Sequence, residues 1–143
     1  EDNISFINRQ KLGQIVFNNA DKMKVLEEIL HPLARESSDE FIEKCRSEGK
    51  EFAVLDIPLL FETGGQDRVD VVFCVSAGPD VQKARVLARP GMTEEKFHQI
   101  LSRQMPDREK RRLADYVILT DVSLAQTRNQ LISIINTLRE AHT

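Results

Sequence analysis

The chain has 143 residues and a formal net charge of −3, with 41% hydrophobic and 30% charged residues. This length and balance predict one compact globular domain and exclude a disordered chain. The slightly acidic charge argues against a general nucleic-acid binder, which is usually basic. No apolar run approaches the ~18 residues of a membrane span, so no membrane partner is expected.

The two cysteines, Cys45 and Cys74, do not form a C-x-x-C motif. We therefore expect free thiols, a cytoplasmic protein and no protein-bound metal. The three histidines show no metal-ligand spacing either. The chain starts at Glu1, without methionine or a signal-peptide pattern, so we expect it to begin inside a longer protein.

The first third of the chain has helical spacing of apolar residues. Helices are expected over 8–17, from an N-cap at Asp21 to residue 30, and over 33–48. The pair His31-Pro32 is expected to separate the second helix from the third, because a residue before proline disfavours helical backbone. Gly49 is well placed to end the third helix.

Three short apolar runs, 52–55, 69–75 and 116–119, predict buried strands. Helices are expected between and after them, at 79–89, from a Thr93 cap, in a short basic stretch ending at Ala114, and from a Ser123 cap to the C-terminus. Strands that alternate with helices predict an α/β fold with a parallel sheet. Three strands form a narrow sheet, so we expect the first strands of the fold to be absent from this sequence.

Gln82, Arg85 and Arg89 lie at helical spacing and are expected to share one helix face. Two arginines in register can clamp a polyphosphate, because each guanidinium bonds two oxygens at once. The alternative interpretation is a solvated basic face, since most such charges are surface groups.

Pro90-Gly91 follows as a turn between two helices, and a basic stretch comes after it. This helix–turn–helix between two strands is typical of a kinase lid, which closes over phosphates and excludes water. A charged surface hairpin is the alternative, and Asp107-Arg108 is expected to be only a local pair. The polar and basic residues of the stretch are Arg103, Gln104, Arg108, Lys110, Arg111 and Arg112.

Asp56 directly follows the first predicted strand, at the sheet edge where ligands bind in open α/β folds. Its carboxylate could hold magnesium through water, orient a hydroxyl or simply cap the next turn. The apolar loop Pro58-Leu59-Leu60-Phe61 suits a pantetheine arm or an adenine face, or only closes the core. Glu62 is expected to bond a substrate amide or to pair with a lid arginine. His31 either faces this side or satisfies free helix carbonyls.

Taken together and in this order, these segments resemble the dephospho-CoA kinase family over nearly the whole chain. The matching segments are Asn8-Arg9-x-x-Leu12-x-x-x-Val16-Phe17, Ile29-Leu30-His31-Pro32, Asp56-Ile57-Pro58-Leu59-Leu60-Phe61-Glu62, Gln82-x-x-Arg85-x-x-x-Arg89, Gln104 and Ala114-Asp115-Tyr116-Val117-Ile118.

The resemblance implies a P-loop kinase-like parallel sheet with helices on both faces, a helical CoA-side segment (1–50), an α/β core (51–78 and 115–143) and a helical lid (79–114). It implies transfer of the ATP γ-phosphoryl group to the 3′-hydroxyl of dephospho-CoA, with Mg²⁺. Arg89 would act at the transferring group, and Gln82, Arg85, Gln104 and Thr120 would line the ATP side. The acceptor side would comprise Arg9, His31, Asp56, Pro58, Leu59, Leu60, Phe61 and Glu62.

Two features depart from the family pattern. The sequence contains no glycine-rich loop ending in Gly-Lys-Ser/Thr, the motif whose amides hold phosphates. Thr120 stands where the family usually has asparagine near the adenine. We therefore expect a truncated, inactive form of the enzyme. A nucleoside or nucleotide kinase of the same fold, and a non-catalytic module that binds a CoA-like ligand or a protein, remain the alternatives. Oligomeric state has no signal in the sequence.

Overall fold

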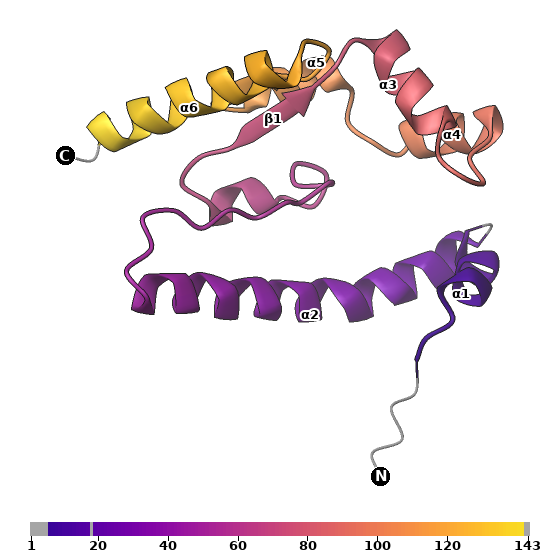
Figure 1. Cartoon of the computed structure of the whole chain (residues 1–143). Helices are drawn as coiled ribbons and strands as arrows, with labels where there is room; N and C mark the ends of the chain where they lie inside the picture. Colours follow the sequence, from indigo (N-terminus) through magenta and orange to yellow (C-terminus); the bar gives the residue numbers. More distant parts are fainter. Residues whose placement is uncertain (1–5, 18, 142–143) are drawn as a thin grey trace. The chain divides into compact units, whose positions relative to one another are not determined.

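The computed structural model describes residues 6–17 and 19–141 (Figure 1). The chain divides into two compact units, Glu1–Asp56 and Ile57–Thr143. Each unit is described by itself below.

The first unit consists of two helices, α1 (Arg9–Val16) and α2 (Ala20–Ser47). Each begins at an asparagine side chain that accepts a backbone N–H: Asn8 from Lys11 at 3.0 Å and Asn19 from Lys22 at 2.9 Å. Asn19, rather than the predicted Asp21, is therefore the cap of α2. An asparagine cap satisfies an otherwise unpaired donor of the first turn.

Helix α2 runs through Pro32, so the predicted helix break at His31-Pro32 is wrong. The bias against helical backbone before proline is a preference, and here the 28-residue helix continues through the proline although Pro32 cannot donate a helix hydrogen bond. His31 consequently lies inside a helix and not at its end. The predicted stop at Gly49 is confirmed: α2 ends at Ser47 and Gly49 has φ +65°, a left-handed conformation that glycine adopts without a Cβ clash.

The second unit is an α/β unit built on two parallel strands, β1 (Phe73–Ser76) and β2 (Tyr116–Leu119). Phe73 pairs with Tyr116, and their rings stack with centroids 5.6 Å apart. The α/β class with a parallel sheet is thus confirmed. The helical segments of this unit are the 3-10 helix η1 (Gly65–Arg68), α3 (Pro79–Leu87), α4 (Glu94–Leu101), α5 (Asp107–Leu113) and α6 (Leu124–Ala141).

The strand predicted over 52–55 is not formed, and the strand predicted over 69–75 begins only at Phe73. Phe52 and Val54 are exposed, the latter to 76%. A short apolar run becomes a strand only where a neighbouring strand pairs with its backbone, and the sheet among the described residues has two strands. Apolar composition alone therefore over-predicted strand here.

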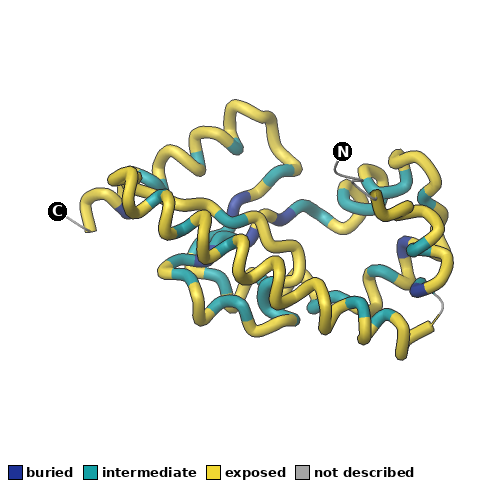
Figure 2. The backbone as a smooth tube through the Cα atoms, turned by 90° about the horizontal axis from the view of Figure 1, so that it is seen from below, coloured by how far each residue is buried: buried dark blue, intermediate teal, exposed yellow. Residues whose placement is uncertain are grey.

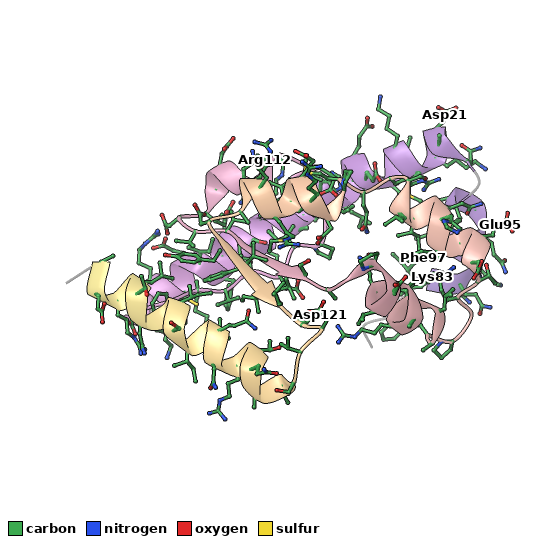
Figure 3. The ribbon with its side chains drawn as sticks, turned by 90° about the horizontal axis from the view of Figure 1, so that it is seen from above. Asp21, Lys83, Glu95, Phe97, Arg112 and Asp121 are labelled. Carbon is green, nitrogen blue, oxygen red and sulfur yellow. The ribbon has the colours of Figure 1, made fainter. Side chains whose placement is uncertain are left out.

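Helices α5 and α6 lie on opposite sides of the two strands (Figure 3). They contact β1 and β2 respectively. Most buried residues lie in or beside the strands, at Val72, Cys74, Ser76 and Ile118 (Figure 2). Both strands end at the same edge, because they are parallel, and the chain leaves that edge toward α3 and α6. This carboxyl edge is where the α/β fold presents ligand-binding residues.

Candidate functional site

Ser76 and Thr120 meet at the carboxyl edge of the sheet. The Thr120 amide and its hydroxyl both donate to the Ser76 carbonyl, at 2.8 and 3.1 Å. The Ser76 side chain is itself buried and donates to Asp107 Oδ1 at 2.8 Å. Asp107 opens α5, so one serine links the end of β1 to the start of α5.

Arg85 is attached to this edge. Its guanidinium donates to Thr120 Oγ1 at 3.0 Å and to the Thr120 carbonyl at 2.5 Å. The structure therefore brings together two of the predicted ATP-side residues, Arg85 and Thr120. Gln82 lies one turn earlier on the same helix and is half-buried.

Arg89 is placed differently from Arg85. Helix α3 ends at Leu87 with Ala88 as its C-cap, so Arg89 lies just beyond the helix that was expected to include it. The residue is exposed. Among the described residues its side chain has no hydrogen-bond or acidic partner. Arg89 is thus a free cation next to the turn at Gly91, which has φ +75°.

The helices α3 and α4 form a hairpin that polar contacts hold together. Lys83 Nζ lies 3.0 Å from Glu94 Oε1, and the hydrogen bond from Lys83 lowers the pKa of the Glu94 carboxyl. Lys96 Nζ donates to the Gly91 carbonyl at 2.8 Å, across the turn. The predicted Thr93 cap is confirmed, because Thr93 Oγ1 accepts the Lys96 amide at 3.2 Å.

The predicted acceptor loop, residues 57–64, is a compact series of turns. Thr63 donates its hydroxyl to the Leu59 carbonyl at 2.8 Å, and the Gly65 amide donates to the Leu60 carbonyl at 2.8 Å. A Cβ on Gly65 would lie only 2.9 Å from Leu60 Cδ1, so the loop closes tightly at this glycine. Pro58 and Leu59 are exposed, whereas Leu60 and Phe61 are half-buried.

Glu62 ends the apolar part of this loop and contacts the segment that follows α4. Glu62 Oε1 accepts the Met105 amide at 2.7 Å and Lys110 Nζ at 2.9 Å. Burial raises the pKa of Glu62, but the hydrogen bonds from Lys110 and Met105 outweigh it and hold the pKa below its ordinary value. The basic partner of Glu62 is therefore a lysine, Lys110, and not the lid arginine that was one of the two expectations.

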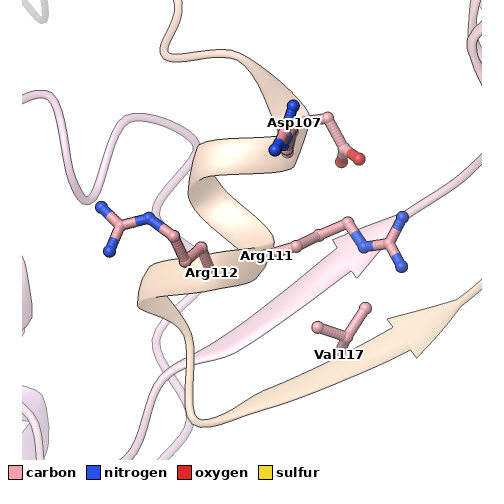
Figure 4. A pocket seen from close by; sticks show the side chains of 5 residues that line it. Asp107, Arg111, Arg112 and Val117 are labelled. Atoms are coloured by element: carbon pink, nitrogen blue, oxygen red, sulfur yellow. The ribbon is translucent and has the colours of Figure 1, made fainter.

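A basic cavity of about 430 Å³ lies between α5 and β2 (Figure 4). Arg111 and Arg112 point in opposite directions from α5, and Arg112 Nε pairs with Glu109 at 3.0 Å. The predicted arginine-rich stretch thus places part of its charge beside the sheet and part along the outer face of α5. The lining residues are Asp107, Arg108, Arg111, Arg112 and Val117.

Three predicted acceptor residues belong to the first unit. Arg9 begins α1, His31 is exposed in the middle of α2, and Asp56 is exposed in irregular backbone. Their convergence on the loop at 57–64 stays a prediction, and so does the predicted division into 1–50, the core and the lid.

Sequence reasoning missed several aspartates that organise the edge and the strand starts. Asp107 was expected to form only a local pair, but it accepts the buried Ser76 hydroxyl. Asp121 Oδ2 accepts the Gly78 amide at 2.9 Å, and Asp115 Oδ2 accepts the Val72 amide at 2.7 Å. Local spacing could not find these bonds, because their partners lie 31 to 43 residues away along the chain. The sequence feature that could have identified these aspartates is their position, since each lies close to a predicted strand or at the start of a helix.

Thr120→Val is expected to destabilise the second unit by about 1–2 kcal/mol, because it removes the hydroxyl that bridges Arg85 and the Ser76 carbonyl. Thr137→Val is the matched control: its hydroxyl bonds only the Ser133 carbonyl on the exposed face of α6, and a change within about 0.5 kcal/mol is expected. Urea unfolding measures both. Equal effects would mean that the Thr120 bridge adds nothing to stability.

No group of three His, Cys, Asp or Glu side chains within 6–17 and 19–141 is arranged to hold a metal ion. Both cysteines are free thiols, with Cys74 buried. Across those same residues, no helix is long and apolar enough to cross a membrane.

The comparison with known proteins decides the family. A family model described as CoaE, dephospho-CoA kinase, matches residues 3–126. The chain belongs to the dephospho-CoA kinase family. It is 53% identical over 133 residues to a dephospho-CoA kinase of Mesorhizobium japonicum, covering 93% of this chain and 68% of that protein. A dephospho-CoA kinase of Agrobacterium fabrum is 50% identical over 132 residues, covering 92% and 68%.

Solved structures agree with the family. The structure of TT1252 from Thermus thermophilus has a TM-score of 0.73 and 31% identity, covering 92% of this chain and 67% of that one. A dephospho-CoA kinase from Campylobacter jejuni has a TM-score of 0.68 and 29% identity, covering 100% and 71%. The present dephospho-CoA kinase family member therefore shares its fold with these two proteins and spans about two thirds of its relatives' length. Kinase, transferase and coenzyme A biosynthesis are the activity class and the pathway to which the family belongs.

Proposed function

We propose that this chain supplies the acceptor side, the lid and two sheet strands of a dephospho-CoA kinase. The enzyme would transfer the γ-phosphoryl group of ATP to the 3′-hydroxyl of dephospho-CoA. The family match over residues 3–126 carries this proposal. The lid hairpin at α3 and α4, beside the carboxyl edge of a parallel sheet, supports it, because phosphoryl transfer depends on positioning and on charge stabilisation.

On the ATP side, the two lid arginines would have different tasks. Arg85 is bound to Thr120, so it would shape the edge on which the nucleotide lies. Arg89 has no partner among the described residues, and its charge would stabilise the transferring phosphoryl group. Gln82 and Gln104 would support this side. Thr120 already bonds Arg85 and the Ser76 carbonyl, so it would offer adenine fewer hydrogen bonds than an asparagine.

On the acceptor side, the turns at Pro58, Leu59, Leu60 and Phe61 would provide an apolar surface for the pantetheine arm. We also propose that Arg9, His31 and Asp56 of the first unit bind dephospho-CoA. Glu62 closes this loop onto the segment that follows α4.

Mg²⁺ would enter with ATP and neutralise charge on its phosphates when bound. The residues described in this chain do not form a metal site of their own, so no step of this proposal passes through a protein-bound metal. We place the enzyme in the cytoplasm, where free thiols such as Cys45 and Cys74 persist.

The 143-residue chain by itself should not catalyse phosphoryl transfer. Its sequence contains no Gly-Lys-Ser/Thr loop to hold the phosphates. Purified chain, assayed with ATP, Mg²⁺ and dephospho-CoA, is expected to give no CoA above background, while the M. japonicum relative serves as positive control. CoA formation by the chain would refute this expectation.

A chimera tests the substrate assignment. Fusion of this chain to the part of the M. japonicum relative that the match leaves out should restore phosphorylation of dephospho-CoA. A preference of the chimera for a nucleoside monophosphate would instead favour a nucleotide kinase of the same fold. An inactive chimera that folds and binds dephospho-CoA would favour a non-catalytic binding module.

A further inference from the structure

We infer that Glu62 is a positioning residue that couples the acceptor loop at 57–64 to the lid, by fixing the linker at 102–106 between α4 and α5. The names of these two segments rest on the proposed function. The coupling itself rests on contacts within the second unit.

One oxygen of Glu62 accepts two donors from the far side of the lid, the Met105 amide at 2.7 Å and Lys110 Nζ at 2.9 Å. Met105 lies in the linker and is 43 residues away from Glu62. Its neighbour Gln104 is a proposed lid residue, so a bond to the Met105 amide fixes the backbone next to Gln104.

The side chains of Glu62 and Lys110 are only 17% and 19% exposed, whereas the Glu109–Arg112 pair on the same helix is 44% and 68% exposed. A charge pair that is largely removed from water interacts more strongly than a solvated one. Breaking it from one side also leaves an uncompensated charge. Of these two ion pairs of α5, the Glu62–Lys110 pair is therefore the stronger, and we assign to it the role of fixing the linker.

Glu62 Oε2 is buried and has no hydrogen-bond partner among the described residues. A buried carboxylate that satisfies only one oxygen depends on its remaining donors, because an unpaired acceptor in a dry site costs free energy. The Met105 amide and the Lys110 ammonium are those donors, so the loop and the linker should move together.

Amide exchange at Met105 tests the positioning in the intact 143-residue chain, followed by NMR without any substrate. Glu62→Ala removes the acceptor and is expected to speed exchange of the Met105 amide at least tenfold. Glu62→Gln keeps an acceptor oxygen, so the Met105 amide should regain most of its protection from exchange. This variant also keeps the test possible if Glu62→Ala does not fold. Glu109→Ala is the matched control and should leave Met105 unchanged. Unchanged Met105 exchange in Glu62→Ala would overturn the inference.

The pH dependence of the Met105 signal gives a readout that a merely structural contact would not move. Lys110 is the charged group that faces Glu62. Because the folded pKa of Glu62 is lowered, the interaction is complete above the unfolded-state pKa and is lost as pH falls through the folded one. The Met105 amide shift should follow that transition in the wild type and not in Glu62→Gln. A transition that persists in Glu62→Gln would contradict the assignment.

Dephospho-CoA then tests the coupling. In the wild type, the amide signals of Leu60 and Met105 should shift with one midpoint as dephospho-CoA is added. In Glu62→Ala the Leu60 shift should remain and the Met105 shift should disappear. A Met105 shift retained in Glu62→Ala would overturn the coupling. A wild type that shows no shift at all would remove the acceptor assignment, while the exchange experiment would still decide whether Glu62 fixes the linker.

Discussion

Replacing Arg89 by alanine is expected to lower kcat of the chimeric kinase about 10³-fold, because arginines that stabilise a transferring phosphoryl group contribute on this scale. Arg89 has no partner among the described residues, and it lies beside the Pro90-Gly91 turn of the lid hairpin. Steady-state kinetics with dephospho-CoA and ATP measure the effect. The loss should appear in kcat more than in KM if the charge acts in the transition state.

Two variants give this experiment its controls. Arg89→Lys keeps a positive charge without the two-pronged guanidinium, and an intermediate loss is expected. Arg128→Ala removes an exposed arginine of α6 and should leave kcat within about twofold. If the kcat of Arg89→Ala stays within about fivefold of the kcat of the parent chimera, the alternative interpretation would hold, in which Arg89 is part of a solvated basic face.

Asp115→Ala is expected to destabilise the second unit by about 2–3 kcal/mol, because it leaves the amide of the buried Val72 without its acceptor. Asp115 bridges the starts of both strands: its carboxylate accepts the Val72 amide at 2.7 Å, and its own amide donates to the Val72 carbonyl at 3.0 Å. Tyr116 lies next to it and is the one tyrosine in a chain without tryptophan. Tyrosine fluorescence during urea unfolding therefore reports on this unit.

Asp115→Asn is the matched variant, since its amide oxygen can still accept the Val72 N–H. A cost below about 1 kcal/mol is expected for it. If asparagine and alanine destabilise the unit equally, the charge of Asp115 and not its hydrogen bond is what matters. If neither costs more than 0.5 kcal/mol, the bridge at the strand starts is not a source of stability.

Local chemistry explains which parts of the fold were predictable. Thr93 and Ser123 each accept a backbone amide in the first helical turn, as their positions before helical stretches indicated. Gly49 takes a positive φ just after α2. The last predicted strand is formed as predicted, at Tyr116–Leu119. These features depend on a few neighbouring residues, so the sequence contains the information directly.

The two wrong predictions concern segments whose structure is determined by more than their own few residues. Residues 52–55 have the composition of a buried strand, but they form no strand. Pro32 has a local preference against helix, yet the hydrogen bonds of the rest of α2 carry the helix through it. In both cases the local signal was real and was outweighed by structure elsewhere in the chain.

The candidate site shows the same division. The spacing of Gln82, Arg85 and Arg89 indicated a phosphate clamp, but it could not show that Arg85 is bound to Thr120 while Arg89 is free. That difference comes from a contact across 35 residues. Likewise, Glu62 was predicted to meet either a substrate amide or a lid arginine, and only the fold identifies Lys110 and the Met105 amide as its partners.

The bonds that close the second unit span nearly constant lengths of chain. Val72 to Asp115, Gly78 to Asp121 and Glu62 to Met105 are each 43 residues apart. The first two of these bonds fasten the ends of the segment that contains the hairpin at the sheet, so that segment is a closed loop. The entropy of closing such a loop grows only with the logarithm of its length, about 0.6 kcal/mol for each doubling. Residues can therefore be inserted or deleted at the Pro90-Gly91 turn during evolution at little cost to the stability of the sheet. An insertion or deletion within β1 or β2 would instead change the register in which the two strands pair.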